Sequence, residues 1–242
     1  MRLDKFLVES GLGSRSQVKQ LLKKGQVWVN GTAVTSAKTQ IDERSDQIVV
    51  DGQTLVYEKF VYYLLNKPKG VISATEDDRH KTVLDLLDDA ARQKEVFPVG
   101  RLDVDTHGLL LLTNNGQLSH AMLSPKRHVA KVYQAQVAGL MDQADVELFA
   151  QGIELKDFTC QPAQLEIIER DEGAQTSLVR ITLSEGKFHQ VKRMVLACGK
   201  EVTDLQRLSM GPLQLYPDLE LGQWRRLTEE EMQSLEIFQV EL

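Results

Sequence analysis

The most informative stretch of this sequence is residues 100–113, which read GRLDVDTHGLLLLT. Two carboxylates, an arginine, a threonine and a histidine lie between a glycine and an apolar run. The run Leu109–Leu112 is short and is followed by turn-forming residues at 113–116, which predicts a fully buried strand that ends in a turn. The polar residues then form a loop that enters this strand at the rim of a cleft. Packing explains the leucines and glycines, but it does not readily explain Arg101 together with Asp103.

The same stretch resembles the signature of the pseudouridine synthases, in the branch that modifies ribosomal RNA and carries an N-terminal S4 domain. The pattern is GRLD, two variable residues, T, one variable residue and GL, and every fixed position is present in residues 100–109. The resemblance implies that Asp103 is the catalytic aspartate. Asp105 occupies a variable position, so it is assigned no catalytic role.

Length, composition and cysteine usage are those of an ordinary globular protein. A chain of 242 residues can bury one good core and leave room for a smaller second domain. Cys160 and Cys198 are far apart and neither belongs to a C-x-x-C pair, which is typical of reduced thiols. No apolar stretch has the length of a membrane span, and residues 1–5 do not open a signal peptide. We therefore expect a cytoplasmic protein with no membrane partner.

Basic residues are concentrated at the N-terminus, although the net charge of the chain is −6. Residues 1–40 hold seven basic and two acidic side chains, a net charge of +5, so the remaining residues carry −11. This asymmetry fits a basic RNA-contacting module attached to an acidic body. A solvated basic helix would explain the charge alone equally well.

The N-terminal segment predicts two helices followed by a hairpin. The first helix is expected over residues 2–9, and the second is capped by Ser14 or Ser16 and runs to Lys24. Residues 27–34 read as a hairpin turned by Asn-Gly. This order, and the pattern RLDKFL…SR…V…L…G.V.VNG, resemble the S4 RNA-binding domain.

The S4 resemblance implies an RNA-binding role for the basic side chains of this segment. Arg15, Lys19 and Lys23 recur every four residues, so they share one face of the second helix. Such a stripe positions RNA through its phosphates without reading sequence. The candidate RNA-binding residues are Arg2, Lys5, Arg15, Lys19, Lys23 and Lys24.

The organisation that we expect is an S4 domain over residues 1–50, a connection over 51–59 and a synthase domain over 60–242. The stretch LLNKPKGVIS, residues 64–73, again resembles the synthase family, and it predicts a strand, a turn and a second strand at 71–73. Further strands are predicted near 129–138, 164–168 and 177–183, and helices near 82–87, 142–150 and 191–198. Because strands and helices do not alternate regularly, the predicted fold is α+β with a largely antiparallel sheet. The family resemblance implies the same fold, with a central cleft.

Two further motifs complete the predicted active site. By resemblance, Tyr133 stacks on the target base, whereas a lone tyrosine on a strand is usually a packing residue. The stretch EGKFHQVKRM, residues 185–194, resembles the third family signature. It implies that Lys192 pairs with Asp103, with Arg193 as an alternative partner. Lysine offers a point charge there instead of the two-pronged guanidinium of arginine.

The remaining polar residues of the motifs have open interpretations. Arg101 either holds the RNA backbone near the target nucleotide or forms a structural salt bridge. His189 is interpreted as a hydrogen-bonding residue at a helix start. The spacing of Asp103, Asp105 and His107 matches no standard set of metal ligands, and no nucleotide-binding fingerprint is present. We therefore expect neither a metal ion nor a cofactor.

The implied reaction is the isomerisation of uridine to pseudouridine. Asp103 would either attack C1′ of the ribose or remove a sugar proton, and the sequence does not choose between these routes. The acidic C-terminal residues 216–242 resemble the enzyme that acts on bacterial 16S ribosomal RNA; the alternative is 23S ribosomal RNA. A non-catalytic RNA-binding or ribosome-assembly factor and a metal nuclease remain alternatives from other classes. The expected partner is 16S RNA or the assembling small subunit, and the protein is expected to be a monomer.

Overall fold

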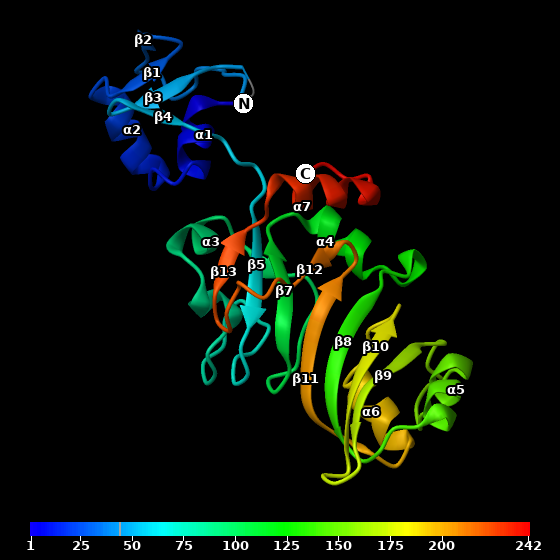
Figure 1. Ribbon diagram of the computed structural model, residues 1–242. Coiled ribbons are helices and arrows are strands. Elements are labelled where there is room, and N and C mark those ends of the chain that lie inside the picture. Colours follow the sequence, from blue (N-terminus) through cyan, green and yellow to red (C-terminus); the bar gives the residue numbers. More distant parts are fainter. Residues whose placement is uncertain (44) are drawn as a thin grey trace. The chain divides into compact units, whose positions relative to one another are not determined.

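The computed structural model describes residues 1–43 and 45–242, and it divides the chain into two compact units (Figure 1). The first unit comprises Met1–Val61 and Asp88–Glu95, and the second comprises Tyr62–Leu87 and Val96–Leu242. Among the described residues, no helix is long and apolar enough to cross a membrane.

The first unit contains an antiparallel sheet with the strand order β2-β1-β3-β4. The two predicted helices and the hairpin are confirmed. The Ser14 hydroxyl accepts a hydrogen bond from the Gln17 amide, and the Gln17 side chain accepts one from the Ser14 amide, so Ser14 is the residue that caps the second helix. The elements are α1 (Leu3–Glu9), α2 (Arg15–Lys23), β1 (Val27–Val29), β2 (Thr32–Ala33), β3 (Ile48–Val50), β4 (Gln53–Leu55) and α3 (Asp89–Gln93).

A small hydrophobic core holds this unit together. One face of α1 and one face of α2 bury their apolar side chains with those of β1 and β3, which leaves the opposite face of α2 in solvent. The buried core residues are Leu3, Phe6, Leu7, Val18, Leu22, Val27, Ile41, Ile48 and Val50.

Residues 51–59, predicted as a connection, instead belong largely to the first unit. Asp51 and Gly52 both have positive φ angles and turn β3 into β4, because an Asp-Gly pair favours a tight hairpin turn. Further along, the ring of Tyr57 stacks on Phe6 with a centroid distance of 5.3 Å, and its hydroxyl donates to Glu9 at 2.8 Å. The polar, glycine-containing composition that suggested a linker is that of a hairpin turn.

The second unit is built on a nine-stranded sheet. Its main path has the order β13-β5-β7-β11-β8-β10-β9, with β6 paired to β7 and β12 paired to β11. Among the described strands only β7 and β11 pair in parallel, which confirms the predicted largely antiparallel sheet. The strands are β5 (Tyr62–Lys67), β6 (Phe97–Pro98), β7 (His107–Thr113), β8 (Lys131–Ala138), β9 (Gln164–Asp171), β10 (Thr176–Leu183), β11 (Glu201–Met210), β12 (Leu213–Gln214) and β13 (Trp224–Arg226).

Helices cover parts of this sheet and form much of its core with it. In Figure 1, α5 and α6 lie beside the β8–β10 half, where α5 contacts β9 and α6 contacts β11. Their buried side chains include Phe149, Val191 and Met194, which pack with apolar residues of β8 and β10. The helices are η1 (Val83–Leu86), α4 (Gly116–Leu123), η2 (Pro125–Arg127), α5 (Gln143–Gln151), α6 (Gln190–Ala197), α7 (Glu229–Ser234) and η3 (Leu235–Phe238).

Two local predictions need correction. The strand expected at 71–73 is absent: Ile72 makes a single bridge with Thr82, because its backbone pairs with the segment that leads into η1 and not with the sheet. That segment, predicted as a helix over 82–87, forms the 3₁₀ helix η1. The central strand β11 was not predicted. The other predicted strands and helices of this unit are confirmed with shifts of a few residues at their ends.

Candidate active site

The polar half of residues 100–113 forms the loop between β6 and β7, as the sequence predicts. Ser73 fixes this loop, since its hydroxyl accepts from the Leu102 amide at 3.0 Å and donates to the Leu102 carbonyl at 2.9 Å. The Thr106 amide donates to the Asp103 carbonyl at 3.1 Å and closes a turn. Asp103 then lines a pocket in the second unit.

Lys67, at the end of β5, anchors the same loop from inside the protein. Its side chain is fully buried, and its ammonium donates to the carbonyls of Pro68, Asp103 and Thr106 at 3.1, 3.0 and 2.9 Å. Burial lowers the pKa of Lys67 to about 8, although the charge of Asp103 opposes this shift. At neutral pH the ammonium therefore remains largely charged and holds the backbone of Asp103.

Gly108 allows the loop to pass close to β11. A Cβ atom at this position would lie 2.3 Å from the carbonyl oxygen of Arg207 and 2.7 Å from its nitrogen, and the φ angle is +105°. Only glycine combines that backbone angle with such an approach. The glycine of the signature therefore places Asp103 beside β11 and the residues that β11 carries.

The carboxylate of Asp103 faces two basic side chains of the third signature. The Lys192 ammonium lies 3.4 Å from Oδ2, and His189 Nε2 lies 3.5 Å from Oδ1. The same ammonium lies closer to Asp105, at 2.5 Å from Oδ1, and this hydrogen bond lowers the pKa of Asp105. Lys192 thus bridges both carboxylates, of which Asp103 is the less exposed, at 29% against 64% for Asp105.

His189 stands at the N-cap of α6, so it lies at a helix start as predicted, and its side chain makes no capping hydrogen bond. Its backbone has a left-handed conformation, with φ of 49°, which turns the ring towards Asp103. The ring also stacks on the exposed ring of Phe188, with a centroid distance of 3.8 Å and an interplanar angle of 18°. His189 is therefore a wall of the pocket and a second cation-capable neighbour of Asp103.

The structure also locates the two arginines with open interpretations. Arg193 pairs with Asp157, which directs it away from Asp103. Arg101 is exposed, lines the pocket and forms no ion pair with any other described residue. Of the basic residues in the motifs, Lys192 is therefore the one that contacts both carboxylates of the loop.

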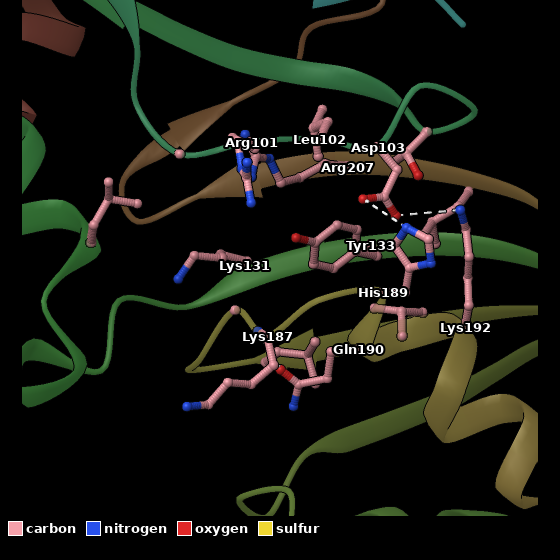
Figure 2. A pocket seen from close by; sticks show the side chains of 17 residues that line it. Arg101, Leu102, Asp103, Lys131, Tyr133, Lys187, His189, Gln190, Lys192 and Arg207 are labelled. Carbon is pink, nitrogen blue, oxygen red and sulfur yellow. Dashed lines mark hydrogen bonds and ion pairs between the residues drawn. The ribbon is translucent and has the colours of Figure 1, made fainter. Parts of the chain in front are cut away.

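Tyr133 lies in the same pocket, on β8. Figure 2 shows its ring between the loop that carries Asp103 and the start of α6 that carries His189 and Gln190. The pocket is lined by Gly100, Arg101, Leu102, Asp103, Thr106, Leu123, Lys131, Tyr133, Leu183, Gly186, Lys187, His189, Gln190, Val191, Lys192, Leu205 and Arg207. All the motif residues predicted for the active site, Asp103, Tyr133, Lys192 and Arg101, are thus gathered around one cavity.

Two buried cations of this pocket were not predicted. Arg207 on β11 is 2% exposed, and Lys131 on β8 is 8% exposed. Lys131 stands two residues before Tyr133, so the period of the strand places both on one face. Arg207 could not be found in the same way. It alternates with Leu205 and Ser209, but an arginine on a strand rarely points inward, so this pattern did not predict a buried cation.

The basic residues of the first unit fall into two groups. Arg15, Lys19, Lys23 and Lys24 are exposed at α2 and form no ion pair with another described residue. Arg2 instead pairs with Asp4 at 2.6 Å, and Lys5 lies 3.6 Å from Glu9. The stripe on α2 therefore keeps its charges available, whereas those of Arg2 and Lys5 are partly neutralised.

The sequence and the fold match a known family of RNA-modifying enzymes. The sequence matches the family model described as RNA pseudouridylate synthase over residues 61–197 and the S4 domain over residues 1–48. The chain therefore belongs to the RNA pseudouridylate synthase family. It is a pseudouridine synthase with an N-terminal S4 domain, which confirms the family that the motifs indicated.

Several relatives are similar to the chain over almost its whole length. An uncharacterized RNA pseudouridine synthase of Bacillus subtilis, YtzG, is 44% identical over 97% of this chain and 98% of the relative. The ribosomal small subunit pseudouridine synthase A of Escherichia coli is 39% identical over 97% and 100%. The ribosomal large subunit pseudouridine synthase B of Bacillus subtilis is also 39% identical, over 97% and 95%. A crystal structure of a pseudouridylate synthase superimposes with a TM-score of 0.66, at 36% identity, over 97% of this chain and 99% of that chain.

Proposed function

We propose that this protein converts a uridine of bacterial 16S ribosomal RNA to pseudouridine, with Asp103 as the catalytic carboxylate and without a cofactor. The observation that supports the chemistry best is the position of Asp103. Its carboxylate lines the pocket, faces Lys192 and His189, and lies near Tyr133. These contacts orient the carboxylate oxygens towards the pocket, where a nucleophile or base is needed.

The reaction divides into three tasks for these side chains. The target uridine leaves its stack and enters the pocket, where the ring of Tyr133 replaces part of the lost stacking. The ionised Asp103 then either attacks C1′ or accepts the proton from C2′ as the bond between C1′ and N1 breaks. The detached base turns within the pocket and rejoins the ribose through C5. Lys192 holds the carboxylate in position throughout.

The choice of 16S RNA rests on the relatives and on the acidic C-terminal segment. The similarity to the small subunit enzyme of Escherichia coli extends over that whole protein, and the chain has the acidic C-terminal segment described above. The large subunit enzyme of Bacillus subtilis is equally identical, so 23S RNA is the second candidate. We propose that the protein acts as a cytoplasmic monomer on 16S RNA or on the assembling small subunit, with the S4 domain holding the RNA.

A pseudouridine map of both ribosomal RNAs tests this proposal. Carbodiimide-dependent stops of reverse transcription are compared in cells that lack the protein, cells with the wild type restored, and cells that carry Asp103→Asn. We expect one 16S stop to disappear without the protein and to return only with the wild type. Loss of a 23S stop would move the substrate, whereas an unchanged map or full restoration by Asp103→Asn would overturn the assignment of catalysis and leave a binding role.

A further inference from the structure

Arg207 has a guanidinium that the protein satisfies only in part. Its Nε donates to the Leu109 carbonyl at 2.8 Å, at the place where β7 and β11 run in parallel. Its Nη2 is buried and donates to no acceptor among residues 1–43 and 45–242. An unpaired donor on a buried charge is costly unless a water molecule or a ligand supplies the acceptor. Arg207 lines the pocket, so a substrate in the pocket is one source of that acceptor.

Arg207 and Lys131 are two buried basic side chains in the same part of the pocket. Arg207 lies opposite Tyr133 in the register of β11 and β8. Lys131 stands two residues before Tyr133 and lies on the same face of β8 as Tyr133. Burial lowers the pKa of Lys131, and the charge of Arg207 lowers it further while Glu185 opposes the shift. Asp103, which also lines the pocket, directs its carboxylate towards Lys192 and His189 and not towards Arg207. Figure 2 shows Arg207 and Lys131 on adjacent strands, with Tyr133 between them and the start of α6.

We propose that Arg207 is a catalytic residue whose guanidinium donates to a carbonyl oxygen of the uracil ring and stabilises the negative charge of the departing base. This inference rests on the proposed function. The base is the part of the nucleotide that enters the pocket, whereas its phosphates continue into the RNA chain and stay at the mouth. Exposed cations such as Arg101 and Lys187 serve the phosphates there.

The charge that Arg207 stabilises follows from the bonds that change. When the bond between C1′ and N1 breaks, its electron pair remains with the base and spreads over N1 and the two carbonyl oxygens. The electron deficiency at C1′ is relieved either by a bond to an Asp103 oxygen or by loss of the C2′ proton to Asp103. The base then bonds to C1′ through C5. In this step Asp103 either leaves C1′ or returns its proton to C2′, so it is again a free carboxylate. The C5 proton leaves to water, and N1 takes a proton from water. A fixed donor in a water-poor pocket is strongest where the charge develops.

The proposal is tested by changing the stability of the leaving group. Fluorine at C5 withdraws electrons and stabilises the anionic base without help from the protein. Wild type and Arg207→Gln are compared in single turnovers on RNA that carries uridine or 5-fluorouridine at the target position, and the loss of the original nucleoside is followed after digestion. We expect Arg207→Gln to slow the uridine reaction about 10²-fold to 10³-fold. The loss on 5-fluorouridine should be at least about tenfold smaller, because the anion then needs less stabilisation.

Two controls separate this inference from a structural role and from the proposed function. A residue that only supports the fold would slow both substrates by the same factor, and that result would overturn the proposal. Thermal unfolding reports whether Arg207→Gln folds; if it does not, Arg207→Lys, which keeps the charge, is compared on the same two substrates. If the wild type does not convert uridine, the proposed function itself fails and this inference fails with it.

Discussion

At the scale of single residues, the buried ammonium of Lys67 holds the backbone of the loop that carries Asp103. Lys67 is charged in the interior, where burial lowers its pKa from 10.5 to about 8. Below pH 8 the folded and unfolded chains both bind this proton. Between about pH 8 and 10.5 only the unfolded chain binds it, so the native state gains stability as pH rises, by up to about 3 kcal/mol. We expect the difference in free energy of unfolding between wild type and Lys67→Met to increase across this window, measured by urea titration at successive pH values. A difference that stays flat would contradict it.

The two carboxylates of the loop provide a matched pair for testing catalysis. Asp103 and Asp105 are two residues apart and both contact Lys192, but only Asp103 lines the pocket. We expect Asp103→Asn to lower the single-turnover rate of pseudouridine formation by about 10⁴-fold or more. Asp105→Asn should lower it at most about tenfold, because Lys192 can still pair with Asp103. Equal losses in the two variants would show that the loop, and not the Asp103 carboxylate, carries the effect.

At the scale of elements, the contact between β7 and β11 sets the position of the loop that carries Asp103 relative to the pocket residues on β11. A side chain at Gly108 would collide with the backbone of Arg207, which cannot move as the end of a flexible side chain can. We expect Gly108→Ala to lower the free energy of unfolding by about 3 kcal/mol or more and to abolish activity. Gly116→Ala is the control, since this exposed glycine begins α4 and its Cβ would meet nothing within 4 Å. Its free energy of unfolding should stay within about 0.5 kcal/mol of wild type. Chemical denaturation of both variants checks the contrast.

Local patterns predicted the elements that carry the motifs better than those that complete the pocket. The loop at residues 100–106, the buried strand after it and the helix of the third signature follow from spacing and turn residues. Strand β11 has the mixed sequence EVTDLQRLSM, with weak alternation and a register shift, so nothing local marks it as central. Arg207 and Lys131 become pocket residues only through the pairing of β11 with β8. Burial of a cation is a property of that pairing, and a single strand does not encode it.

The acidic C-terminal segment entered the sequence analysis through a resemblance, and the structure shows what one of its acidic residues does. Glu231 accepts two hydrogen bonds from Arg225, at 2.6 and 2.8 Å, and it completes the capping box of Thr228 at the start of α7. One of the acidic residues in this segment therefore has a structural role. Composition alone could not distinguish such a residue from a solvated charge.

At the scale of the whole molecule, the basic stripe and the pocket lie in different units. The basic stripe Arg15, Lys19 and Lys23 lies on α2 of an S4 domain, while the pocket with its chemistry lies in the second unit. Phosphate contacts release counterions, and each one adds about 0.7 to 0.9 to the slope of log affinity against log salt. The stripe should therefore govern how tightly RNA binds, and the pocket should govern how fast it reacts.

Replacing all three stripe residues with alanine separates these two roles. We expect the affinity for the RNA substrate to fall and the salt slope to decrease by up to about two to three, measured by fluorescence anisotropy over a series of potassium chloride concentrations. The single-turnover rate at saturating RNA should remain within about threefold of wild type, since no stripe residue lines the pocket. Arg180→Ala is the control, because Arg180 is exposed on β10 but already paired with Glu166 at 3.2 Å. If the control changed the slope as much as the triple variant, the basic surface of the S4 domain would have no special part in holding RNA. A fall in the saturated rate would instead mean that the S4 domain also positions the target uridine for reaction.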